Sequence, residues 1–553
     1  MKKFIIKSFT ATIILIMSAG CIKETFPQGS SQTTGQVANL AQATEFMINH
    51  LNSSMMATGT MGYGNPTDFG ISSIHIMTEF MLEDLACMAS NTGYLWYGDY
   101  AACKYQGSRF IYCSYFWDCF YTWIKGTNDV IARIDPDTKN FKDQQILGQA
   151  YAYRAYYYLC LARMFEPKEN KYLDISAVKG LTVPIVTEKT TEKEATNNPR
   201  ATVEEIYKFI FDDLNKAAVL LDGKSIDYTM PSLMMVYGLY ARAYLERGAE
   251  GVEGAYEKAI EYADLVIKQS NKTPLTSKEW HDPSNGFNNG KSNNAWIWGL
   301  TCNSEIQNNL GTFTDQMSPE AQWGYSTITD LGISKDLYDQ ISIKDFRKYS
   351  YFDPKGMKFH KYQMAGSAKE QKDRLEGNMK LGLMPLKPYQ SFKFRPNEGN
   401  CTDFTVGNAA DHCMMRIEEM YFIKAEAEAQ LELLSEASKT LNAIVNTRYE
   451  DGSYNCASKV YDKETFLEEM LLQKRIEFWG EGILFYDYKR LDHGITRSYA
   501  GSNHASDFAI NCDGRSPQWN IVITRSEYQS NVGITEALNN PDPTDFTTPT
   551  PIE

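Results

Sequence analysis

Residues 472–491 read LQKRIEFWGEGILFYDYKRL, a stretch that combines aromatic residues, alternating charge and a pair of glycines. Apolar residues recur at helical spacing from Glu464 to Trp479, which predicts a helix covered on more than one side. Glycine in a helix interior is unfavourable by roughly 1 kcal/mol relative to alanine, so Gly480 and Gly482 predict a break or a close backbone approach. A second aromatic helix is expected over Ile483 to Leu491.

Two acidic residues in this stretch, Glu477 and Glu481, have two interpretations. Their i, i+4 spacing puts both on one helix face, where a carboxylate pair could serve acid–base catalysis. Alternatively, they pair with Arg475 and Arg490 inside a packed polar network. No histidine lies within the stretch and bulky apolar residues surround the pair. We therefore favour the structural interpretation.

The N-terminal residues 1–20 have the features of a secretory signal peptide. Three lysines precede an apolar run, residues 9–17, that is too short to remain as a spanning helix. Small residues at 18–20 then precede Cys21, the arrangement that lipoprotein signal peptidase requires. We expect Cys21 to be lipidated and to anchor the chain, with cleavage without lipid as the alternative. Residues 21–40, rich in Gly, Ser, Thr and Gln, read as the tether.

Charge and cysteine content exclude some classes of function. Removing residues 1–20 removes three lysines and no acid, which takes the net charge from −14 to −17. Such a charge argues against a nucleic-acid partner, whose phosphates need a basic face. Ten cysteines follow Cys21 without a CxxC pair, so zinc spacing is absent. In an exported protein some of them are expected to form disulfides, with the pairing left open.

Most of the chain has helical periodicity, and its length of 553 residues suggests several domains or a repeat array. Thr202 and Glu205 form a predicted capping box. The helix pairs 231–247/255–269 and 415–433/435–448 resemble the tetratricopeptide repeat pattern. Besides those of the quoted stretch, we expect helices over Ile74–Met88, Tyr112–Ile134, Lys142–Phe165, Ala201–Leu221, Pro231–Arg247, Ala255–Gln269, Met415–Leu433 and Ser435–Arg448.

The predicted organisation has two helical regions, 41–270 and 415–495, the second within a C-terminal region 415–538, that flank a different kind of sequence. Residues 271–414 are dense in Asn, Gly, Ser and aromatic residues and show little helical period. A loop of this length in a compact protein is usually functional, so we expect this region to face the ligand. Residues 539–553 are expected to form a disordered tail.

Catalytic and metal-binding motifs do not emerge from the sequence. The segment at 286–292 is one residue short of a phosphate loop and follows no apolar strand. The seven histidines show no i, i+3 or i, i+4 pair, which excludes a zinc-protease helix. Residues 135–137 begin like a calcium loop but lack its later glycine and glutamate. The sequence predicts no catalytic residue, no metal and no cofactor.

The quoted stretch resembles the C-terminal signature of the SusD/RagB family of Bacteroidetes outer-membrane lipoproteins. It departs where Gln473 replaces the usual Glu and where Ile483 and Leu484 replace polar residues. Six segments occur in the family's order: Trp117–Ile134, Ala150–Glu166, Ala201–Leu221, Ala241–Ile267, Arg416–Arg448 and Leu472–Leu491. The residues that fall on the signature are Gln473, Lys474, Arg475, Glu477, Phe478, Glu481, Gly482, Asp487 and Arg490.

This resemblance implies a mostly α, SusD-like fold with four tetratricopeptide-like helix pairs and an irregular, loop-rich half. It also implies a surface-exposed outer-membrane lipoprotein, which Lys23-Glu24, similar to the family's surface-export signal, supports. Such a protein is not an enzyme. It binds a nutrient, most often an oligo- or polysaccharide, and delivers it to a SusC-like TonB-dependent transporter on which its helical scaffold docks.

In the family, the starch binder uses aromatic residues from a loop after an early helix and from the irregular half. An aromatic ring stacks on the C–H face of a sugar while nearby amide and carboxylate groups bind hydroxyls. By resemblance, the candidate ligand-binding residues are Tyr94, Trp96, Tyr97 and Trp323, with Asp84 and Asn91 as polar partners. For each one, packing in the core is the alternative.

Three other functions compete with glycan capture. A RagB-like protein would bind oligopeptides, for which the same mixture of aromatic and polar groups is suitable. A surface glycosidase would need two essential acids in the aromatic region, where no pair stands out. A purely structural partner of the transporter would need no ligand.

Overall fold

The computed structural model describes residues 43–59, 61–63, 67–90, 96–102, 104–284, 287–307, 311–352, 386–459 and 462–544, with only the backbone of Trp96 and Tyr97. The chain divides into two units, residues 1–47 and 48–553. Of the first, only the start of helix α3 (Ala43–Ser54) is described. The signal peptide, Cys21 and nearly all of the tether lie outside the described residues.

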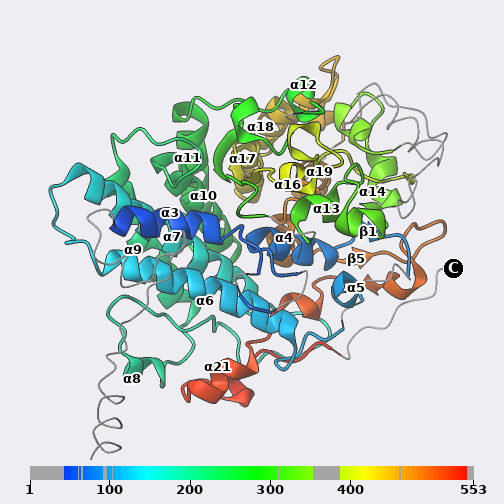
Figure 1. Cartoon of the computed structure of the whole chain (residues 1–553). Helices are drawn as coiled ribbons and strands as arrows, with labels where there is room; N and C mark the ends of the chain where they lie inside the picture. The colour runs from blue at the N-terminus through cyan, green and yellow to red at the C-terminus, as the bar shows by residue number, and fades with distance from the viewer. Residues whose placement is uncertain are drawn as a thin grey trace, which may run out of the picture. The chain divides into compact units, whose positions relative to one another are not determined.

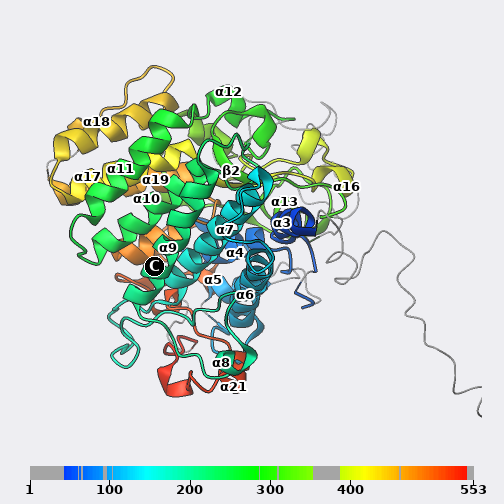
Figure 2. The same ribbon diagram turned by 90° about the vertical axis from the view of Figure 1, so that its left-hand side faces the viewer.

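A series of long helices forms the helical side of the second unit (Figure 1). They are α6 (Ile111–Ile131), α7 (Phe141–Phe165), α9 (Val203–Leu221), α10 (Leu233–Ala249) and α11 (Ala255–Gln269). Each packs on the next in this order, and α11 packs on α17 (Figure 2). Small residues allow the close approach: a Cβ on Gly248 of α10 would lie 2.6 Å from the ring of Tyr256 in α11. The predicted capping box holds, since Thr202 Oγ1 accepts from Glu205 N–H and Glu205 accepts from Thr202 N–H.

The C-terminal helices continue this packing. α17 (Ile417–Gln430) contacts α18 (Leu434–Val445) and α19 (Lys463–Phe478), and α20 (Leu484–Leu491) follows α19 after the two glycines. With one exception, the helices expected from periodicity are therefore present in both regions, and the mostly α fold is confirmed. The detail of four tetratricopeptide-like pairs stays a prediction.

One expected helix is wrong over its second half. Instead of a helix over Ile74–Met88, the chain forms α4 (Ile71–Phe80), a turn, and strand β1 (Leu85–Cys87). Glu79, Glu83 and Asp84, expected on a polar side, are all buried. Contacts from the distant C-terminal region, described below, replace the helical hydrogen bonds of residues 81–84.

The described residues form three short antiparallel strand pairs, of which β1–β3 and β2–β4 connect distant parts of the chain. β1 pairs with β3 (Leu331–Ile333), β2 (Trp296–Leu300) with β4 (His412–Arg416), and β5 (Ile495–Thr496) with β6 (Asn511–Cys512). The region 271–414, expected to be irregular, thus supplies strands β2, β3 and β4. It also contains short helices: α12 (Ser277–Trp280), α13 (Phe313–Met317), α14 (Lys335–Gln340) and α16 (Phe404–Gly407). The remaining short helices are α5 (Trp96–Ala101), α8 (Glu192–Ala195) and α21 (Arg525–Ser530).

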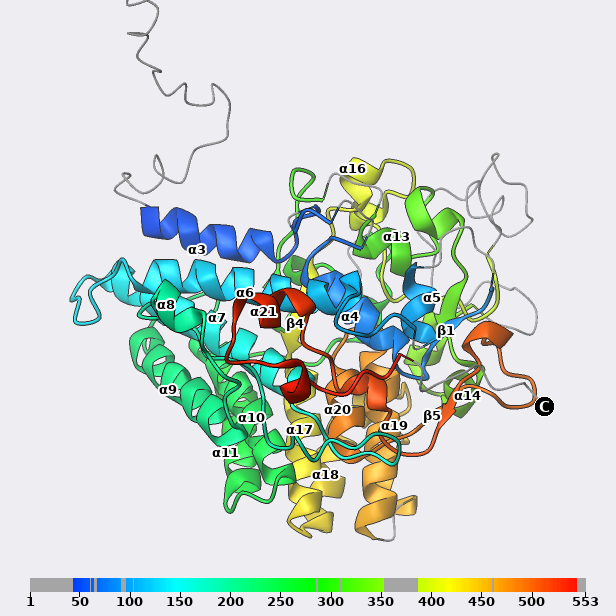
Figure 3. The ribbon, with the colours of Figure 1, turned by 90° about the horizontal axis from the view of Figure 1, so that it is seen from below.

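The C-terminal segment packs against the helical half (Figure 3). Ile521 N–H donates to Met164 O, and the Asn540 amide donates to Phe165 O and Ile521 O. The expected disordered tail is therefore wrong for residues 539–544, because the side chains of Asn539 and Asn540 bind backbone groups. The nine described cysteines after Cys21 are all free thiols. No helix among the described residues is long and apolar enough to cross a membrane.

Candidate functional site

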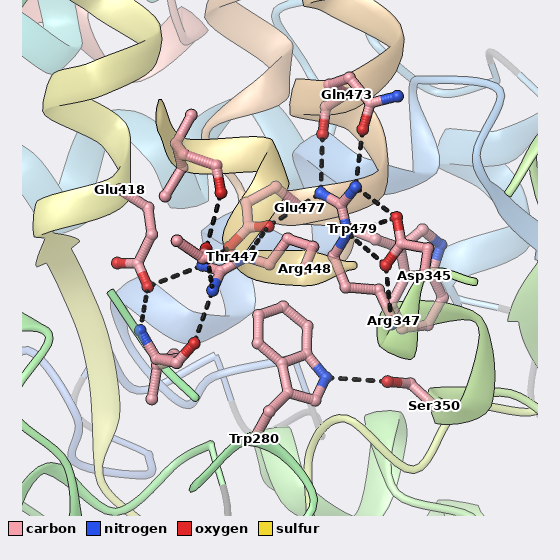
Figure 4. Close-up of polar contacts among 12 residues, drawn as sticks. Trp280, Asp345, Arg347, Ser350, Glu418, Thr447, Arg448, Gln473, Glu477 and Trp479 are labelled. Atoms are coloured by element: carbon pink, nitrogen blue, oxygen red, sulfur yellow. Dashed lines mark hydrogen bonds and ion pairs between the residues drawn. The ribbon is translucent and has the colours of Figure 1, made fainter. Parts of the chain in front are cut away.

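Glu477, on the last turn of α19, is the centre of a buried ion cluster (Figure 4). Its carboxylate accepts from Arg347 at 2.9 Å, from Arg416 at 2.7 Å and from Arg448 at 2.7 Å. The side chain is 0 % exposed. Burial alone would raise its pKa, but the three guanidinium groups hold the pKa well below its ordinary range. Glu477 is thus ionised and has no proton to donate.

Glu481 belongs to the same cluster. It accepts from Lys393 Nζ at 2.6 Å and from Arg416 Nη2 at 2.8 Å. Both acids are shielded from solvent and fully paired with cations, so the acid–base interpretation fails and the structural one is confirmed. The expected partners were wrong: Arg475 binds Asp84, and Arg490 binds Glu426.

Gly480 and Gly482 separate α19 from α20, as predicted. Both have positive φ, 77° and 74°. At Gly482 a Cβ would lie 2.3 Å from His75 Cβ in α4, so the glycine allows the backbone to approach that helix. Its N–H donates to Glu79 Oε1 at 2.8 Å. The glycine break between α19 and α20 is therefore the point at which this part of the chain contacts α4.

The segment from the end of α4 through β1 is held by side chains of the C-terminal region. Arg475 donates to both Asp84 oxygens at 2.9 and 2.7 Å. The Trp479 indole donates to Asp84 O at 2.9 Å, and the Trp519 indole donates to Met81 O at 3.2 Å. These contacts join residues about 400 positions apart, and they fix the segment that leads into residues 88–104.

Two further residues of the C-terminal region, Arg497 and His504, bind the same segment. Arg497 donates to Phe80 O at 2.7 Å and to Ala101 O at 2.5 Å, so it reaches the ends of both α4 and α5. His504 Nε2 lies 3.1 Å from Glu83 O. Burial, and then the Arg497 charge, lowers the pKa of His504 to about 3, so its ring is neutral near pH 7. We refer to Arg475, Trp479, Arg497, His504 and Trp519 as the C-terminal clamp.

The structure places two of the predicted ligand-binding residues, Asp84 and Trp323, in the core. Asp84 is fully buried, and its carboxylate is occupied by Arg475 and the Tyr488 hydroxyl. Trp323 is 6 % exposed and its indole N–H donates to Asn408 Oδ1 at 3.0 Å. Both side chains therefore have a structural role instead of the predicted contact with a ligand, because their polar groups are already paired inside the core.

The other candidates belong to α5 or precede it in the sequence. Trp96 and Tyr97 form its first turn, although their side chains are not among the described ones. Asn91 and Tyr94 lie outside the described residues. Helix α5 packs against α4, and Arg497 of the clamp contacts the ends of both helices.

Tyr105 is an aromatic residue near α5 that sequence reasoning missed. Its side chain is 45 % exposed, and its ring lies 5.0 Å from that of Phe110. Its φ of 56° is in the left-handed region, which tyrosine seldom adopts. The preceding residue is tied to the helix, because Lys104 N–H donates to Asp99 O at 2.7 Å. No sequence signal marks this exposed, strained aromatic residue, since its conformation depends on packing.

An open groove of about 1110 Å³ lies elsewhere, between α19 and the β5–β6 pair. Leu471, Leu472 and Ile495 contribute apolar lining. Two pairs of its charged residues bind each other: Lys459 with Glu469 at 2.9 Å, and Lys171 with Asp513. It contains none of the predicted ligand-binding residues. Among the described residues, no group of His, Cys, Asp and Glu could hold a metal ion.

Comparison with known proteins gives matches along most of the chain. Residues 72–245 match a family model described as starch-binding associating with outer membrane. Residues 276–544 match the model of the SusD family. A SusD-like protein P38 from Formosa agariphila is 23 % identical over 409 residues, which are 68 % of this chain and 72 % of that protein.

Solved structures share the fold at low sequence identity. A SusD-like carbohydrate binding protein from Bacteroides vulgatus superposes with a TM-score of 0.68 at 20 % identity, covering 89 % of this chain and 97 % of its own. The surface glycan-binding protein A from Bacteroides thetaiotaomicron, in complex with laminarihexaose, superposes with a TM-score of 0.62 at 14 % identity, covering 90 % and 99 %.

Proposed function

Because this chain belongs to the SusD/RagB family, we propose that it binds a glycan at the cell surface and delivers it to a SusC-like TonB-dependent transporter of the outer membrane. The observation that carries the proposal is the match of two family models, in order, over residues 72–245 and 276–544. The proposed role consists of binding and transfer, with no bond made or broken.

The proposed glycan surface is centred on α5. Trp96 and Tyr97 supply aromatic rings, Tyr105 extends the aromatic surface beyond the end of the helix, and Tyr94 and Asn91 belong to the preceding segment. An aromatic face is apolar and polarised, which suits the C–H face of a pyranose ring, while amide groups bind its hydroxyls.

The test is calorimetry of the chain from Ile22 to Glu553 against a panel of glycans that includes laminarihexaose and starch oligosaccharides. We expect binding to at least one of them and a loss of at least about tenfold in affinity for Trp96→Ala. Phe141→Ala is the control, because Phe141 is 64 % exposed at the start of α7, away from α5. Binding of peptides alone would replace glycan capture with oligopeptide capture.

The proposal also includes a lipid anchor and a transporter partner, and each is tested separately. Cys21 is proposed to carry the lipid, so Cys21→Ala should move the protein from the membrane fraction to the soluble fraction. The helical side is proposed to dock on the transporter, so the two proteins should purify together from detergent-solubilised outer membrane. Failure to purify together while glycan binding persists would leave capture in place and remove delivery.

A further inference from the structure

The open groove between α19 and the β5–β6 pair offers a binding surface that is separate from α5. Its volume, about 1110 Å³, slightly exceeds the range of about 300 to 1000 Å³ typical of small-ligand sites, so it has room for an oligosaccharide. Leu471 and Ile495 contribute buried apolar surface to it. The described residues that line it include none from α5.

Tyr172, in the segment that follows α7, supplies a partly exposed aromatic ring to the groove. Its hydroxyl accepts from Asp513 N–H at 2.8 Å and donates to Asp513 O at 3.2 Å. These two bonds hold the ring against the loop after β6. A ring that is fixed in advance loses little conformational entropy when the C–H face of a sugar stacks on it.

His493, two residues after α20, lines the groove and supplies a hydrogen-bond acceptor. Its Nε2 lies 3.2 Å from Glu83 Oε1. Burial would raise the pKa of Glu83, but the Arg475 charge holds this pKa at about 2, so the carboxylate is ionised and can only accept. Nε2 therefore carries the proton, which leaves Nδ1 of the neutral ring as an acceptor. No described group binds Nδ1, and the side chain is 34 % exposed.

Asp492 supplies a second acceptor next to His493. Its side chain is 55 % exposed, and its Oδ1 accepts from Arg515 N–H at 2.8 Å. In the described part of the chain, Oδ2 has no partner. The backbone of Asp513 holds Tyr172 and that of Arg515 holds Asp492, so one short loop, residues 513–515, positions the aromatic ring and the carboxylate together.

The charges in the groove favour a neutral ligand that donates hydrogen bonds. Both lysines that line it are paired with acids, Lys459 with Glu469 and Lys171 with Asp513. Asp492 disfavours an anionic ligand, and its Oδ2 and the Nδ1 of His493 both accept. Sugar hydroxyls can donate to them while a sugar ring stacks on an aromatic face. An extended peptide would instead need a strand edge, but β5 and β6 have only two residues each.

We propose that this groove is a second glycan-binding site, which takes a neutral oligosaccharide: a sugar ring stacks on Tyr172, and its hydroxyls donate to Asp492 and His493. The inference goes beyond the proposed function, which places one site around α5, and either site can be lost without the other.

The first test is calorimetry with laminarihexaose and starch oligosaccharides, in which Trp96→Ala removes the α5 contribution. We expect the weaker binding that is left in Trp96→Ala to fall by a further factor of about ten when Asp492→Asn is added. Asparagine keeps an oxygen for Arg515 N–H and tolerates the φ of 55° at this position, so the variant should fold.

The matched control is Asp135→Asn. Asp135 is also exposed and accepts a backbone N–H, from Asp137 at 2.9 Å, but it lies in the turn after α6 and does not line the groove. Added to Trp96→Ala, it should leave the affinity unchanged. Equal affinities of the Asp492→Asn and Asp135→Asn variants would overturn the proposal.

The second test locates the ligand by hydrogen–deuterium exchange with and without each oligosaccharide at millimolar concentration. We expect protection of peptides covering 490–496 and 510–515, which persists in Trp96→Ala and disappears in Tyr172→Ala. Loss of all glycan binding in Trp96→Ala would overturn the groove site and leave the α5 site standing. Protection of the groove in a wild type that Trp96→Ala does not weaken would do the reverse. Protection by an oligolysine peptide and by no oligosaccharide would make the groove a site for basic peptides and overturn the proposal, as would no protection by any ligand.

Discussion

Glu477 shows how much of the fold depends on a single carboxylate. Its three arginine partners lie 29, 61 and 130 residues away in the sequence. Arg347 follows β3, Arg416 ends β4 and Arg448 follows α18, so one side chain on α19 joins three parts of the chain. Removing one member of a buried ion cluster leaves the other charges desolvated and without full compensation.

We therefore predict that Glu477→Gln destabilises the protein by about 3 to 5 kcal/mol, measured as the free energy of unfolding in guanidinium chloride. Glu468→Gln is the control, because Glu468 is on the same helix but exposed. The control should change stability by less than about 0.5 kcal/mol. Equal stability of the two variants would show that the cluster has no structural role.

The buried carboxyl group of Glu79 should make the stability of the protein depend on pH, in a direction that its raised pKa decides. Burial, and then the charge of Asp84, raises its pKa from 4.5 to about 8, against the opposing effect of the Gly482 N–H. Between these values the folded state binds more protons than the unfolded state, so the contribution of Glu79 to stability falls as pH rises from 4.5 to 8. Glu79→Gln removes this titration and keeps an oxygen to accept from Gly482 N–H.

The stability of Glu79→Gln relative to wild type should thus increase between pH 5 and pH 8, by the order of a few kcal/mol. Denaturant unfolding at pH 5, 6.5 and 8 measures the difference. Other titrating groups, such as His412, whose pKa burial lowers to about 4, contribute to both proteins and cancel. Glu257→Gln, on the exposed side of α11, should show no such trend. A constant difference across the three pH values would mean that Glu79 is ionised in the folded protein.

At the scale of elements, the α19–α20 break depends on Gly482. An alanine there would adopt a φ of 74°, which costs roughly 1 to 2 kcal/mol, and would place its Cβ 2.3 Å from His75 Cβ. We predict that Gly482→Ala costs at least about 2 kcal/mol more than Gly501→Ala. Gly501 has a φ of 81° and nothing within 4 Å of its added Cβ, so it reports the backbone strain alone. Equal melting temperatures for the two variants would place α4 farther from the break than the structure does.

Elements were predictable from the sequence where the signal is local. The periodicity of Ala201–Leu221 and its capping box depend on residues a few positions apart, and both are found in α9. The glycine pair likewise marks its own break. The region after Phe80 was not predictable in this way, because residues 81–84 take their partners from the C-terminal clamp.

The candidate site was predictable only in part, for the same reason. Helical spacing places Asp84 on a polar helix face, but it cannot show that Arg475, 391 residues away, binds its carboxylate. Trp323 is aromatic in sequence and buried in structure because Asn408 and Gly407 pack against it. Tyr105 is the reverse case, since its exposure follows from a backbone conformation that composition does not encode.

At the scale of the whole molecule, the C-terminal segment packs back on the region of α6 and α7. The segment after Ser516 returns to the N-terminal helices, where Arg525 N–H donates to Ser108 O at 2.8 Å. The Asn539 side chain accepts from Ile523 N–H and donates to Ile523 O, both at 2.8 Å. Asn540 donates to Phe165 O, the last residue of α7, at 2.8 Å.

These contacts predict that a chain ending at Leu538 is less stable than a chain ending at Thr544. Each lost hydrogen bond contributes about 1 kcal/mol. The buried backbone groups of Ile523 would lose Asn539, and Phe165 O would lose Asn540 while keeping its bond from Arg200, so we expect a loss of a few kcal/mol. Both truncated chains lack residues 545–553, so their difference reports residues 539–544 alone. Thermal unfolding measures it, and Asn540→Ala in the longer chain should reproduce part of the loss. If the two chains melted together, the C-terminal segment would have to be held by residues before 539, and Asn540 would not connect the end of the chain to α7.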